Sequence, residues 1–451
     1  MSLLHRFQQY LPHQELFSVE EKVLLAVSGG IDSVTMVHLF KQAGLSFGIA
    51  HCNFQLRGSV SDEDEQFIKA LAAAKEVPFY SIAFPTAQMA AASKQSIQVV
   101  ARELRYEWLE KIRQENKYQW IATAHHLNDA IETFFYNFTK GAGLKGLRGM
   151  NAKRAHLIRP LLFVPREEIE RYASEENLAF REDSSNLTDK YARNKIRHHV
   201  IPLLKTINPN LEETAARNLD HLEEAYYLYQ LALVAWQQKW VLQMGGQLHI
   251  QKQGLRQDFP AASSLLFETL RNYGFQSAQI AQMLDHLGGE AGAQFFSTTH
   301  RLLVDRAAFI LEPIKTVEDT LDRITVDKEE NVIGLSGGML TFERKSGSPE
   351  TYSSPSESAY IDTKNIRYPL EVRHWQEGDT FCPLGMNGKH QKLQDFFSNN
   401  NLSRFDKEKV WLLVNADGAI IWVIGYRVDD RFKILPSTQS FLEITYLKKV
   451  L

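Results

Sequence analysis

The chain of 451 residues has very little cysteine, and what it lacks excludes several classes of protein. Its two cysteines, Cys52 and Cys382, are too few for a disulfide framework and form no C-x-x-C pair for zinc or an iron–sulfur cluster. No apolar run is long enough to span a bilayer, and residues 1–10 lack the apolar core of a signal peptide. We therefore expect a cytoplasmic protein that makes no contact with membranes.

Neither sign of charge is in large excess, because 51 basic residues stand against 54 acidic ones and the net charge is −3. Any contact with nucleic acid must therefore come from local basic patches rather than from a globally basic surface. The apolar fraction of 44% is ordinary for a globular protein. The length suggests about two to four domains.

Strand and helix patterns alternate through the first 205 residues, which predicts an α/β domain with a mostly parallel sheet and helices on both faces. We expect strands at 23–27, 46–52, 79–84 and 119–124, and helices at 34–40, 95–115 and 127–139. Ligands bind such sheets at the carboxyl ends of the strands. Because Ser28 and His125 both follow strand ends, we expect them to share a cleft.

The pattern changes after about residue 205, where Pro202 and Asn208-Pro209-Asn210 interrupt the chain. Helical patterning then predicts one long helix over 211–244 and further helix to about 287, with short strands up to 313. The C-terminal part has strand patterns at 370–374, 410–414 and 419–424. We expect a catalytic domain at 1–205, a mainly helical domain at 210–315, a strand-like connection at 316–359 and a small α+β domain at 360–451.

The most informative motif is Ser28-Gly29-Gly30-Ile31-Asp32-Ser33, which lies between a predicted strand and a predicted helix. Glycine lets the backbone approach a ligand closely, and the first N–H groups of a helix can bind an anion such as phosphate. The serines can add hydroxyl donors, and Asp32 can hold a cation among phosphate oxygens. This is not a Walker A loop, because no Gly-Lys-Ser/Thr follows. An ordinary tight turn is the alternative.

A histidine and two carboxylates form the second candidate site, at 125–132. A helix that began at His125 would place His125, Asp129 and Glu132 on one face. There the carboxylates could bind Mg²⁺, accept a proton or pair with an ammonium group, or they could only complement the helix dipole. On the preceding predicted helix, Arg102 or Arg105 could reach a phosphate or a carboxylate, or pair with a neighbouring glutamate.

Three basic segments are candidates for contact with a phosphate backbone. Residues 140–159 include no acid, residues 190–199 are rich in basic side chains, and Gly-rich turns surround the basic residues of the last segment. A solvated surface is the alternative for each segment. The side chains that we expect to bind nucleic-acid phosphates are Lys145, Arg148, Arg154, Arg193, Arg197, Arg373, Lys389 and Lys392.

Several blocks of the sequence together resemble the tRNA(Ile)-lysidine synthetase family of the PP-loop ATP pyrophosphatase superfamily. They are SGGIDS at 28–33, HCNFQLRG at 51–58, ARELRY at 101–106, ATAHHLNDAIET at 122–133, GAGLKGLRGM at 141–150, LIRPLLFVPREEIERYA at 157–173, EDSSNLTDKYARNKIRHHVIPLL at 182–204 and RHWQEGDTFCPLGMNGKHQKLQDFF at 373–397. The order of the blocks is more specific than any single block. One block departs from the pattern, because Phe54 stands where relatives often have a second histidine, so no role of that histidine transfers.

The resemblance implies a Rossmann-like PP-loop nucleotide domain and a ligase that forms a C–N bond. Such an enzyme joins L-lysine to C2 of the wobble cytidine in the CAU anticodon of isoleucine tRNA. ATP first adenylates the base with release of pyrophosphate, and the lysine amine then displaces AMP. The resemblance further implies that Ser28, Gly29, Gly30, Ile31, Asp32 and Ser33 bind ATP, that Asp32 and Asp129 hold Mg²⁺, and that Asp32, Arg105, His125, Asp129 and Glu132 are catalytic. The basic segments, the mainly helical domain at 210–315 and the C-terminal domain would bind the tRNA.

Two other functions are open on the sequence. A tRNA thiolase of the same superfamily would need a sulfur carrier, which single and distant cysteines do not supply. A nucleotide-binding regulator without catalysis would have no need of Asp32, Asp129 and Glu132 together. The sequence does not determine the oligomeric state, and a homodimer is one of the assemblies that it allows.

Overall fold

The computed structural model describes residues 1–181, 192–255, 260–289, 291–314, 323–347, 349, 353, 357–386 and 388–448. Lys190 and Tyr191 of the second basic segment, and part of the predicted connection at 316–359, lie outside these ranges. Residues Met1–Gln230 and Leu231–Leu451 form two compact units. No helix within the described ranges combines the length and the apolar character that a membrane span requires.

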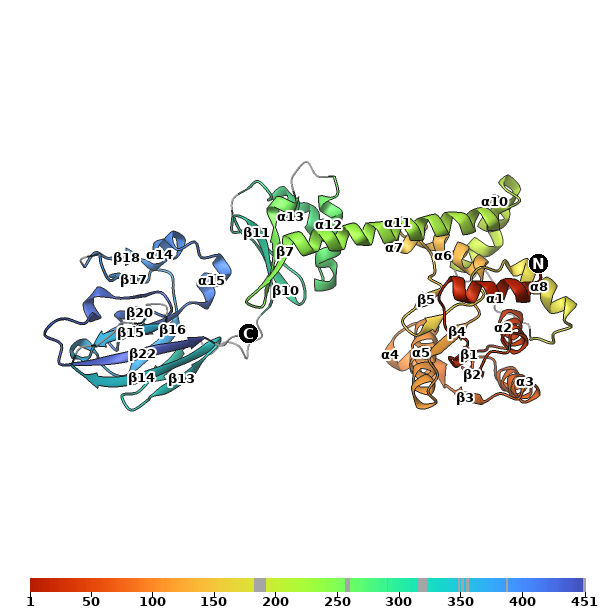
Figure 1. The fold of residues 1–451 in the computed structure, drawn as a ribbon, viewed down its shortest axis with the longest axis horizontal. Helices are drawn as coiled ribbons and strands as arrows, with labels where there is room; N and C mark the ends of the chain where they lie inside the picture. Colours follow the sequence, from red (N-terminus) through yellow and green to blue (C-terminus); the bar gives the residue numbers. More distant parts are fainter. Residues whose placement is uncertain are drawn as a thin grey trace. The chain divides into compact units, whose positions relative to one another are not determined.

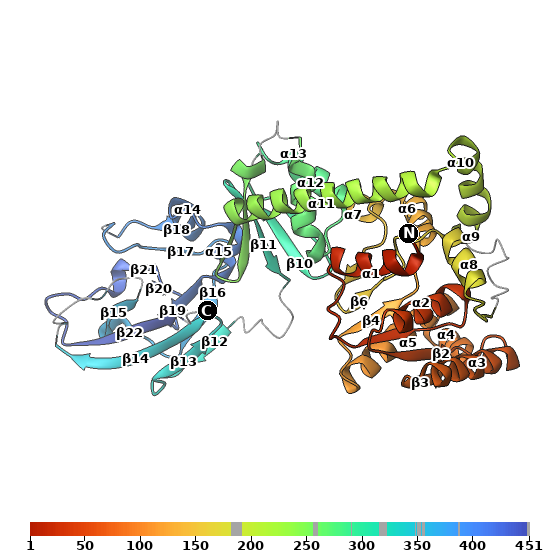
Figure 2. The ribbon, with the colours of Figure 1, turned by 45° about the vertical axis from the view of Figure 1, so that its right-hand side comes forward.

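The first unit is built on a six-stranded sheet in the order β3-β2-β1-β4-β6-β5, in which only β5 is antiparallel to its neighbour (Figures 1 and 2). The strands are β1 (Val23–Ala26), β2 (Phe47–Asn53), β3 (Phe79–Ala83), β4 (Trp120–Thr123), β5 (Lys153–Arg154) and β6 (Leu157–Ile158). This order confirms the predicted parallel sheet. It also creates a topological switch point between β1 and β4, where α/β sheets of this kind bind ligands.

Helices cover the sheet on both faces, as the alternating pattern predicted. They are α1 (Leu3–His13), α2 (Ile31–Gln42), α3 (Ser59–Lys75), α4 (Thr86–Ser93), α5 (Ile97–Glu115), α6 (Leu127–Thr139), α7 (Leu144–Leu147), α8 (Arg166–Glu175), α9 (Ala192–Lys195) and α10 (Ile201–Ile207), with a π-helical turn, η2 (Ile196–Val200), between α9 and α10. Helix α6 begins and ends at the predicted residues, and α5 begins two residues later than predicted.

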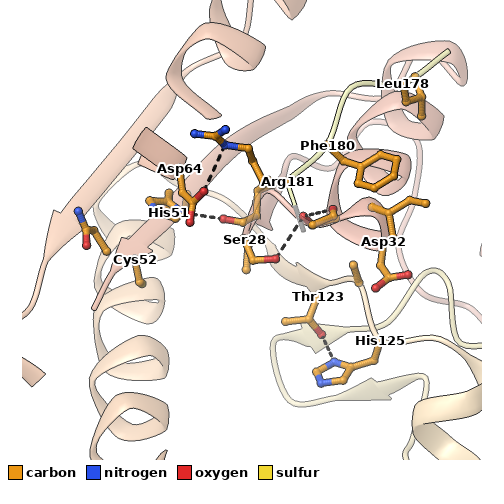
Figure 3. Close-up of a pocket in the computed structure, with 18 of the residues that line it drawn as sticks. Ser28, Asp32, His51, Cys52, Asp64, Thr123, His125, Leu178, Phe180 and Arg181 are labelled. Carbon is orange, nitrogen blue, oxygen red and sulfur yellow. Dashed lines mark hydrogen bonds and ion pairs between the residues drawn. The ribbon is translucent and has the colours of Figure 1, made fainter. Parts of the chain in front are cut away.

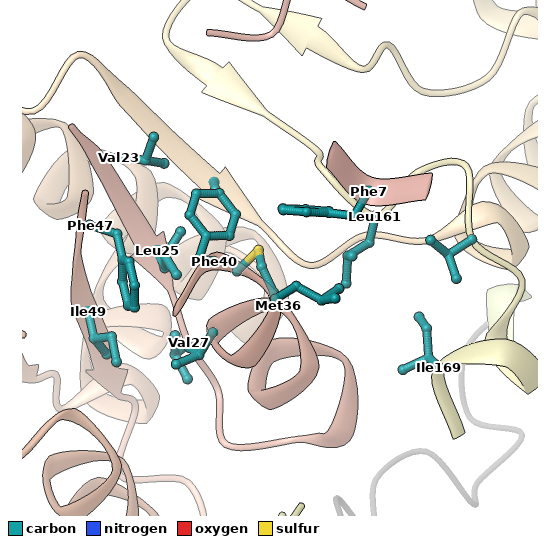
Figure 4. Packing of buried hydrophobic residues seen from close by; sticks show 14 of the residues in the cluster. Phe7, Val23, Leu25, Val27, Met36, Phe40, Phe47, Ile49, Leu161 and Ile169 are labelled. Atoms are coloured by element: carbon teal, nitrogen blue, oxygen red, sulfur yellow. The ribbon is translucent and has the colours of Figure 1, made fainter. Parts of the chain in front are cut away.

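Buried side chains alternate along the central strands and form two cores. On one face, Val23 and Leu25 of β1 belong to a cluster with Phe7 of α1 and Phe40 of α2 (Figure 4). On the other face, Leu24 belongs to a cluster that includes Trp108 and Leu109 of α5. Because helices bury both faces, each parallel strand is a nearly continuous apolar run, which makes such strands recognisable from the sequence.

Helix α11 (Leu211–Trp240) begins in the first unit and continues into the second. Its first turns pack on an apolar cluster formed by α6, η2 and α10. The sequence predicted that this helix continues to Met244, which was wrong for residues 241–244. These residues form β7 (Val241–Met244), which pairs with β8 (Gln247–Gln251). Gly245 and Gly246 both have positive φ, and glycine adopts that conformation readily in the tight turn between two antiparallel strands.

The first part of the second unit contains helices, as predicted, together with more strand than the sequence indicated. Its five-stranded antiparallel sheet has the order β7-β8-β11-β10-β9. The further elements are η3 (Lys252–Leu255), α12 (Ala262–Leu270), η4 (Arg271–Tyr273), α13 (Ser277–Asp285), β9 (Gln294–Phe296), β10 (His300–Val304) and β11 (Ala308–Pro313).

The last part of the chain is a small α+β domain, as predicted. It has a five-stranded sheet in the order β12-β16-β19-β20-β21 and a four-stranded sheet in the order β13-β14-β22-β15, and one apolar cluster contains residues of both sheets. The predicted strands at 370–374, 410–414 and 419–424 correspond to β16, β19 and β20. The elements are β12 (Arg323–Val326), β13 (Val332–Leu335), β14 (Gly338–Ser346), β15 (Ser358–Asp362), η6 (Thr363–Asn365), β16 (Leu370–His374), β17 (Thr380–Phe381), β18 (Gln391–Lys392), α14 (Leu393–Asn399), α15 (Arg404–Lys409), β19 (Trp411–Val414), β20 (Ile420–Val423), β21 (Arg427–Val428), η7 (Asp430–Phe432) and β22 (Ser440–Lys448).

Candidate active site

A cavity of about 1360 Å³ opens at the carboxyl edge of the first unit's sheet. Its wall includes Ser28 after β1, Phe54 after β2 and His125 after β4, so the loops that follow three adjacent strands line it. Figure 3 shows Ser28, Asp32 and His125 around this space. The prediction that Ser28 and His125 share a cleft is therefore confirmed. Side chains of α8 complete the wall.

The loop of residues 28–33 has the conformation of an anion site. Gly29 has a φ of 88°, a left-handed conformation that favours glycine, and Gly30 caps α2. The Ser33 hydroxyl accepts from the Gly29 N–H at 3.2 Å and donates to the Gly30 carbonyl at 2.9 Å, which fixes the loop against the first turn. The unpaired N–H groups at the start of α2 therefore lie beside the cavity, where they favour a phosphate group.

The Asp32 carboxylate is held by an arginine from a distant helix. Arg166, the first residue of α8, donates from Nη1 to both carboxylate oxygens of Asp32, at 2.5 and 2.6 Å. Its Nε donates to Glu170 at 2.7 Å, and its backbone N–H donates to the Asn128 side chain at 2.9 Å. Arg166 therefore connects the phosphate loop, α8 and α6, and its guanidinium also lines the cavity.

His125 lies in the cavity wall in a neutral state. The Thr123 hydroxyl is 2.8 Å from His125 Nδ1. Burial lowers the pKa of His125 to about 4, and this effect outweighs the opposing influence of Asp129. Helix α6 begins at Leu127, as predicted, so His125 lies before the helix rather than on one helical face with Asp129 and Glu132. His126 is extended and its backbone N–H donates to Asp129, which caps the helix.

Asp129 and Glu132 lie on α6 next to the cavity rather than among the residues that line it. Glu132 is only 1% exposed, and Arg197 binds it through two hydrogen bonds of 2.6 and 3.0 Å. Burial alone would raise the pKa of Asp129, but His126, His125 and Arg193 outweigh it and the pKa is lowered. Both acids are therefore paired with cations, and the lowered pKa keeps Asp129 ionised at neutral pH.

Arg105, the arginine predicted to orient the reaction intermediate, projects into the same cavity from α5. Its guanidinium carbon lies 5.2 Å from the centre of the Phe54 ring, within range of a cation–π interaction. Phe54 therefore supports Arg105 at the position where the family often has a histidine.

The two carboxylates predicted to hold Mg²⁺ approach the same side chain. His126 Nε2 is 3.9 Å from Asp32 and 3.5 Å from Asp129. Among the residues that the structure describes, no group of three or more His, Cys, Asp or Glu side chains is arranged to hold a metal. Mg²⁺ usually binds one or two carboxylates together with phosphate oxygens and water. These residues thus fit a magnesium ion whose remaining ligands come from a bound nucleotide.

The side chains predicted to bind nucleic acid fall into two groups. Lys145, Arg154, Lys389 and Lys392 are exposed. The other four have partners within the protein: Arg193 and Arg197 with Asp129 and Glu132, Arg148 with Glu223 and the Tyr226 ring, and Arg373 with Asp379. The second group therefore has defined structural partners in addition to its predicted role, which stays a prediction.

Sequence reasoning missed two arginines of the cavity wall, Arg166 and Arg181. The backbone N–H of Arg181 donates to the Gly29 carbonyl at 3.0 Å, and its side chain pairs with Glu63 at 2.9 Å and Asp64 at 3.4 Å. Arg166 lies in the block at 157–173 that resembles the family, but no role was predicted for it there, and Arg181 lies outside the blocks. Only an indirect argument could have predicted Arg166: a carboxylate such as Asp32 beside a phosphate site is expected to have a cation near it.

Comparisons with known proteins agree along the whole chain. Residues 3–204 match the model of a PP-loop domain, residues 243–314 that of the TilS substrate binding domain, and residues 370–444 that of the TilS substrate C-terminal domain. The chain is 38% identical over 449 residues to a protein of Parabacteroides distasonis named tRNA(Ile)-lysidine synthase, covering 99% of this chain and 100% of that protein. A protein of Bacteroides thetaiotaomicron with the same name is 35% identical, with 97% and 98% covered. One from Porphyromonas gingivalis is 33% identical, with 99% of each chain covered.

Proposed function

The chain belongs to the tRNA(Ile)-lysidine synthase family, and on that premise we propose that it joins L-lysine to C2 of the wobble cytidine in the CAU anticodon of isoleucine tRNA, forming lysidine. The reaction uses ATP in two steps. The C2 carbonyl oxygen of the cytidine attacks the α-phosphorus of ATP, and pyrophosphate leaves. The lysine amine then attacks C2, loses a proton and displaces AMP.

One observation carries this proposal: the phosphate loop and His125 open from neighbouring strand ends onto one cavity. The N–H groups of the loop and of α2 bind the phosphates that become pyrophosphate. Neutral His125 can accept or donate a hydrogen bond at the adenylated base without adding charge. Arg105, supported by Phe54, neutralises negative charge on the adenylate.

Asp32 and Asp129 would hold Mg²⁺ together with ATP, and the metal would supply charge neutralisation on the phosphates. Asp32 would then share its carboxylate between the metal and Arg166. Asp129 and Glu132 are also the candidates for binding the lysine ammonium group or removing its proton, because they are the two carboxyl groups of α6 beside the cavity. Arg197 donates two hydrogen bonds to Glu132. The lysine amine would therefore bind Glu132 beside Arg197 or displace it.

Exposed basic side chains in both units would bind the tRNA. Lys145 and Arg154 lie in the catalytic unit, and Lys389 and Lys392 lie in the C-terminal domain. Phosphate contacts at both positions would let the enzyme read parts of the tRNA outside the anticodon. A homodimer and a cytoplasmic location stay predictions.

The direct test is to incubate the protein with ATP, radiolabelled lysine and isoleucine tRNA, and to analyse the tRNA by mass spectrometry. We expect one lysine per tRNA, located in the anticodon loop, and no product from methionine tRNA with the same anticodon. A protein that binds ATP but adds no lysine would contradict the proposal.

ATP–pyrophosphate exchange with and without tRNA tests the regulator, and the group transferred to the tRNA tests the thiolase. A lysidine-forming enzyme exchanges pyrophosphate only when tRNA is present, because the base is the group that is adenylated. A regulator without catalysis shows no exchange in either case. A thiolase would transfer sulfur instead of lysine, and the two cysteines lie in different units, at Cys52 and Cys382.

A further inference from the structure

Arg159 lies at the ligand edge of the sheet, one strand beyond His125. Strand β6 is parallel to β4, and Ile158 pairs with Ala122. Arg159 follows Ile158 directly, as Thr123 follows Ala122, so Arg159 and Thr123 reach the same level of the sheet. The Thr123 hydroxyl in turn contacts His125. In the strand order β1-β4-β6, the phosphate loop therefore lies on one side of His125 and Arg159 on the other.

Arg159 is buried, and the described part of the chain gives it no ion-pair partner. Its exposure is 7%, and its Nη1 donates to the backbone carbonyl of Asn151 at 2.5 Å. Its Nε has no hydrogen-bond partner, and no carboxylate of the described residues lies within ion-pair distance. A buried charge is unfavourable unless an opposite charge pairs with it. A bound anion would supply the opposite charge that Arg159 lacks among the described residues.

Two further arginines extend the positive charge outwards from Arg159. Arg154 lies on β5, which pairs with β6, and Arg102 lies on α5 with its guanidinium 5.0 Å from the centre of the Tyr106 ring. Both are exposed, and neither is ion-paired within the described part of the chain. Burial lowers the pKa of Arg159, and Arg102 and Arg154 lower it further, although Tyr106 and Asp129 act in the opposite direction. The three guanidinium groups therefore lie close enough to repel one another. An oxyanion would relieve this repulsion.

We propose that Arg102, Arg154 and Arg159 form an oxyanion site, and that it binds a phosphodiester group of the RNA beside the nucleotide that reacts. The inference rests on the proposed function and adds a contact to it. The phosphates of ATP already have the loop at 28–33. A free amino acid brings a single carboxylate, which Arg159 alone could bind. Arg102 and Arg154 add two exposed positive charges next to Arg159. A polyanion such as RNA can contact all three groups, whereas a single carboxylate cannot.

The test measures binding of a fluorescein-labelled anticodon stem-loop RNA at several salt concentrations, without ATP or lysine. We expect R102Q and R154Q each to reduce the slope of log K against log salt by about 0.7–0.9, and the double variant by about 1.5. ATP affinity should not change. The matched control is K111Q, which removes the same charge from an exposed position of α5 where Lys111 pairs with Glu115. It should leave the slope as in wild type.

The buried arginine needs a variant that keeps the charge. R159K preserves it but loses the planar fork of the guanidinium group, so we expect weaker RNA binding with an unchanged melting temperature. An unchanged salt slope in the R102Q/R154Q variant would overturn the proposal. So would a change confined to the KM for lysine, since the bound anion would then be the amino-acid carboxylate. If the variants show these effects on RNA binding but the wild-type protein forms no lysidine, the proposed function is refuted and the oxyanion site is supported.

Discussion

Arg166 donates two hydrogen bonds from Nη1 to the carboxylate of Asp32, although the two residues lie 134 positions apart in the sequence. One residue starts α8 and the other lies in the first turn of α2. The carboxylate beside the phosphate loop is therefore already oriented before any nucleotide binds. Orientation of this kind reduces the reorganisation that a catalytic group requires when the substrate arrives.

The Asp32→Asn variant should fold but lose most adenylation, because it removes a carboxylate that binds both Arg166 and, in our proposal, Mg²⁺. We expect pyrophosphate release in the presence of tRNA to fall by about 100-fold or more. The control is Glu170→Gln, which removes the other carboxylate bound to Arg166. It should retain most activity. Near-normal turnover of a folded Asp32→Asn protein would rule out the role that we assign to Asp32.

The Arg197→Gln variant should be markedly less stable than wild type. It leaves Glu132, a carboxylate that is almost fully buried, without its closest partner, and breaking a buried ion pair costs about 3 kcal/mol or more. Adding Glu132→Gln should restore much of that stability, since the buried side chain at position 132 is then neutral. Urea unfolding of the two single variants and the double variant measures this coupling. Additive losses in the double variant would show that the two side chains do not depend on each other.

A fragment of residues 1–230 should bind ATP, whereas a fragment of residues 1–204 should be unstable. The first turns of α11 cover the apolar cluster around Leu127, Ile131 and Ile201, and Glu223 pairs with Arg148. Removing them exposes apolar surface that the remaining chain cannot bury. Melting temperature and ATP affinity of both fragments test this. Equal stability of the two fragments would mean that α11 contributes nothing to the catalytic unit.

A fragment of residues 1–230 that binds ATP should still modify tRNA poorly, because remote contacts help to position the reacting group. We expect the Lys389→Gln/Lys392→Gln variant of the whole chain to show the same trend more mildly. Its tRNA affinity should fall and become less dependent on salt, while its ATP affinity stays unchanged. The control is Lys345→Gln, whose side chain pairs with Glu343 and Glu443. Loss of ATP binding in the double variant would contradict the assignment.

Stability should depend on pH through His125. Its pKa is about 4 in the folded protein and near 6.5 in an unfolded chain, so only the unfolded chain takes up the proton between these values. The stability that comes from keeping His125 neutral is present above pH 6.5 and is lost as the pH falls towards 4. The His125→Gln variant should therefore lose less stability than wild type between pH 7 and pH 4.5. If wild type and the His125→Gln variant lose equal stability between pH 7 and pH 4.5, the pKa of His125 is not lowered by folding.

Much of the catalytic unit could be predicted from residues close together in the sequence. The strands at 23–27 and 119–124 were recognisable because helices bury both of their faces, so each is an apolar run. The phosphate loop was recognisable because its glycines and serines meet local needs of a strand-to-helix turn. The start of α6 at Leu127 was also predicted, but its cap was not: Asp129 accepts from the His126 N–H, and capping depends on backbone geometry that a spacing argument does not contain.

The sequence by itself therefore determined the parallel sheet, the phosphate loop and the family, because each depends on local order: apolar periodicity, turn residues and blocks in a fixed sequence. Only the tertiary structure decided which charges meet. It paired Arg166 with Asp32 and Arg197 with Glu132, and it left Arg159 buried with no ion-pair partner among the described residues. These outcomes depend on how α8, η2 and β6 pack beside β1 and β4. The sequence around a charged side chain does not identify its partner, because ion pairs form through space between residues that can be far apart along the chain.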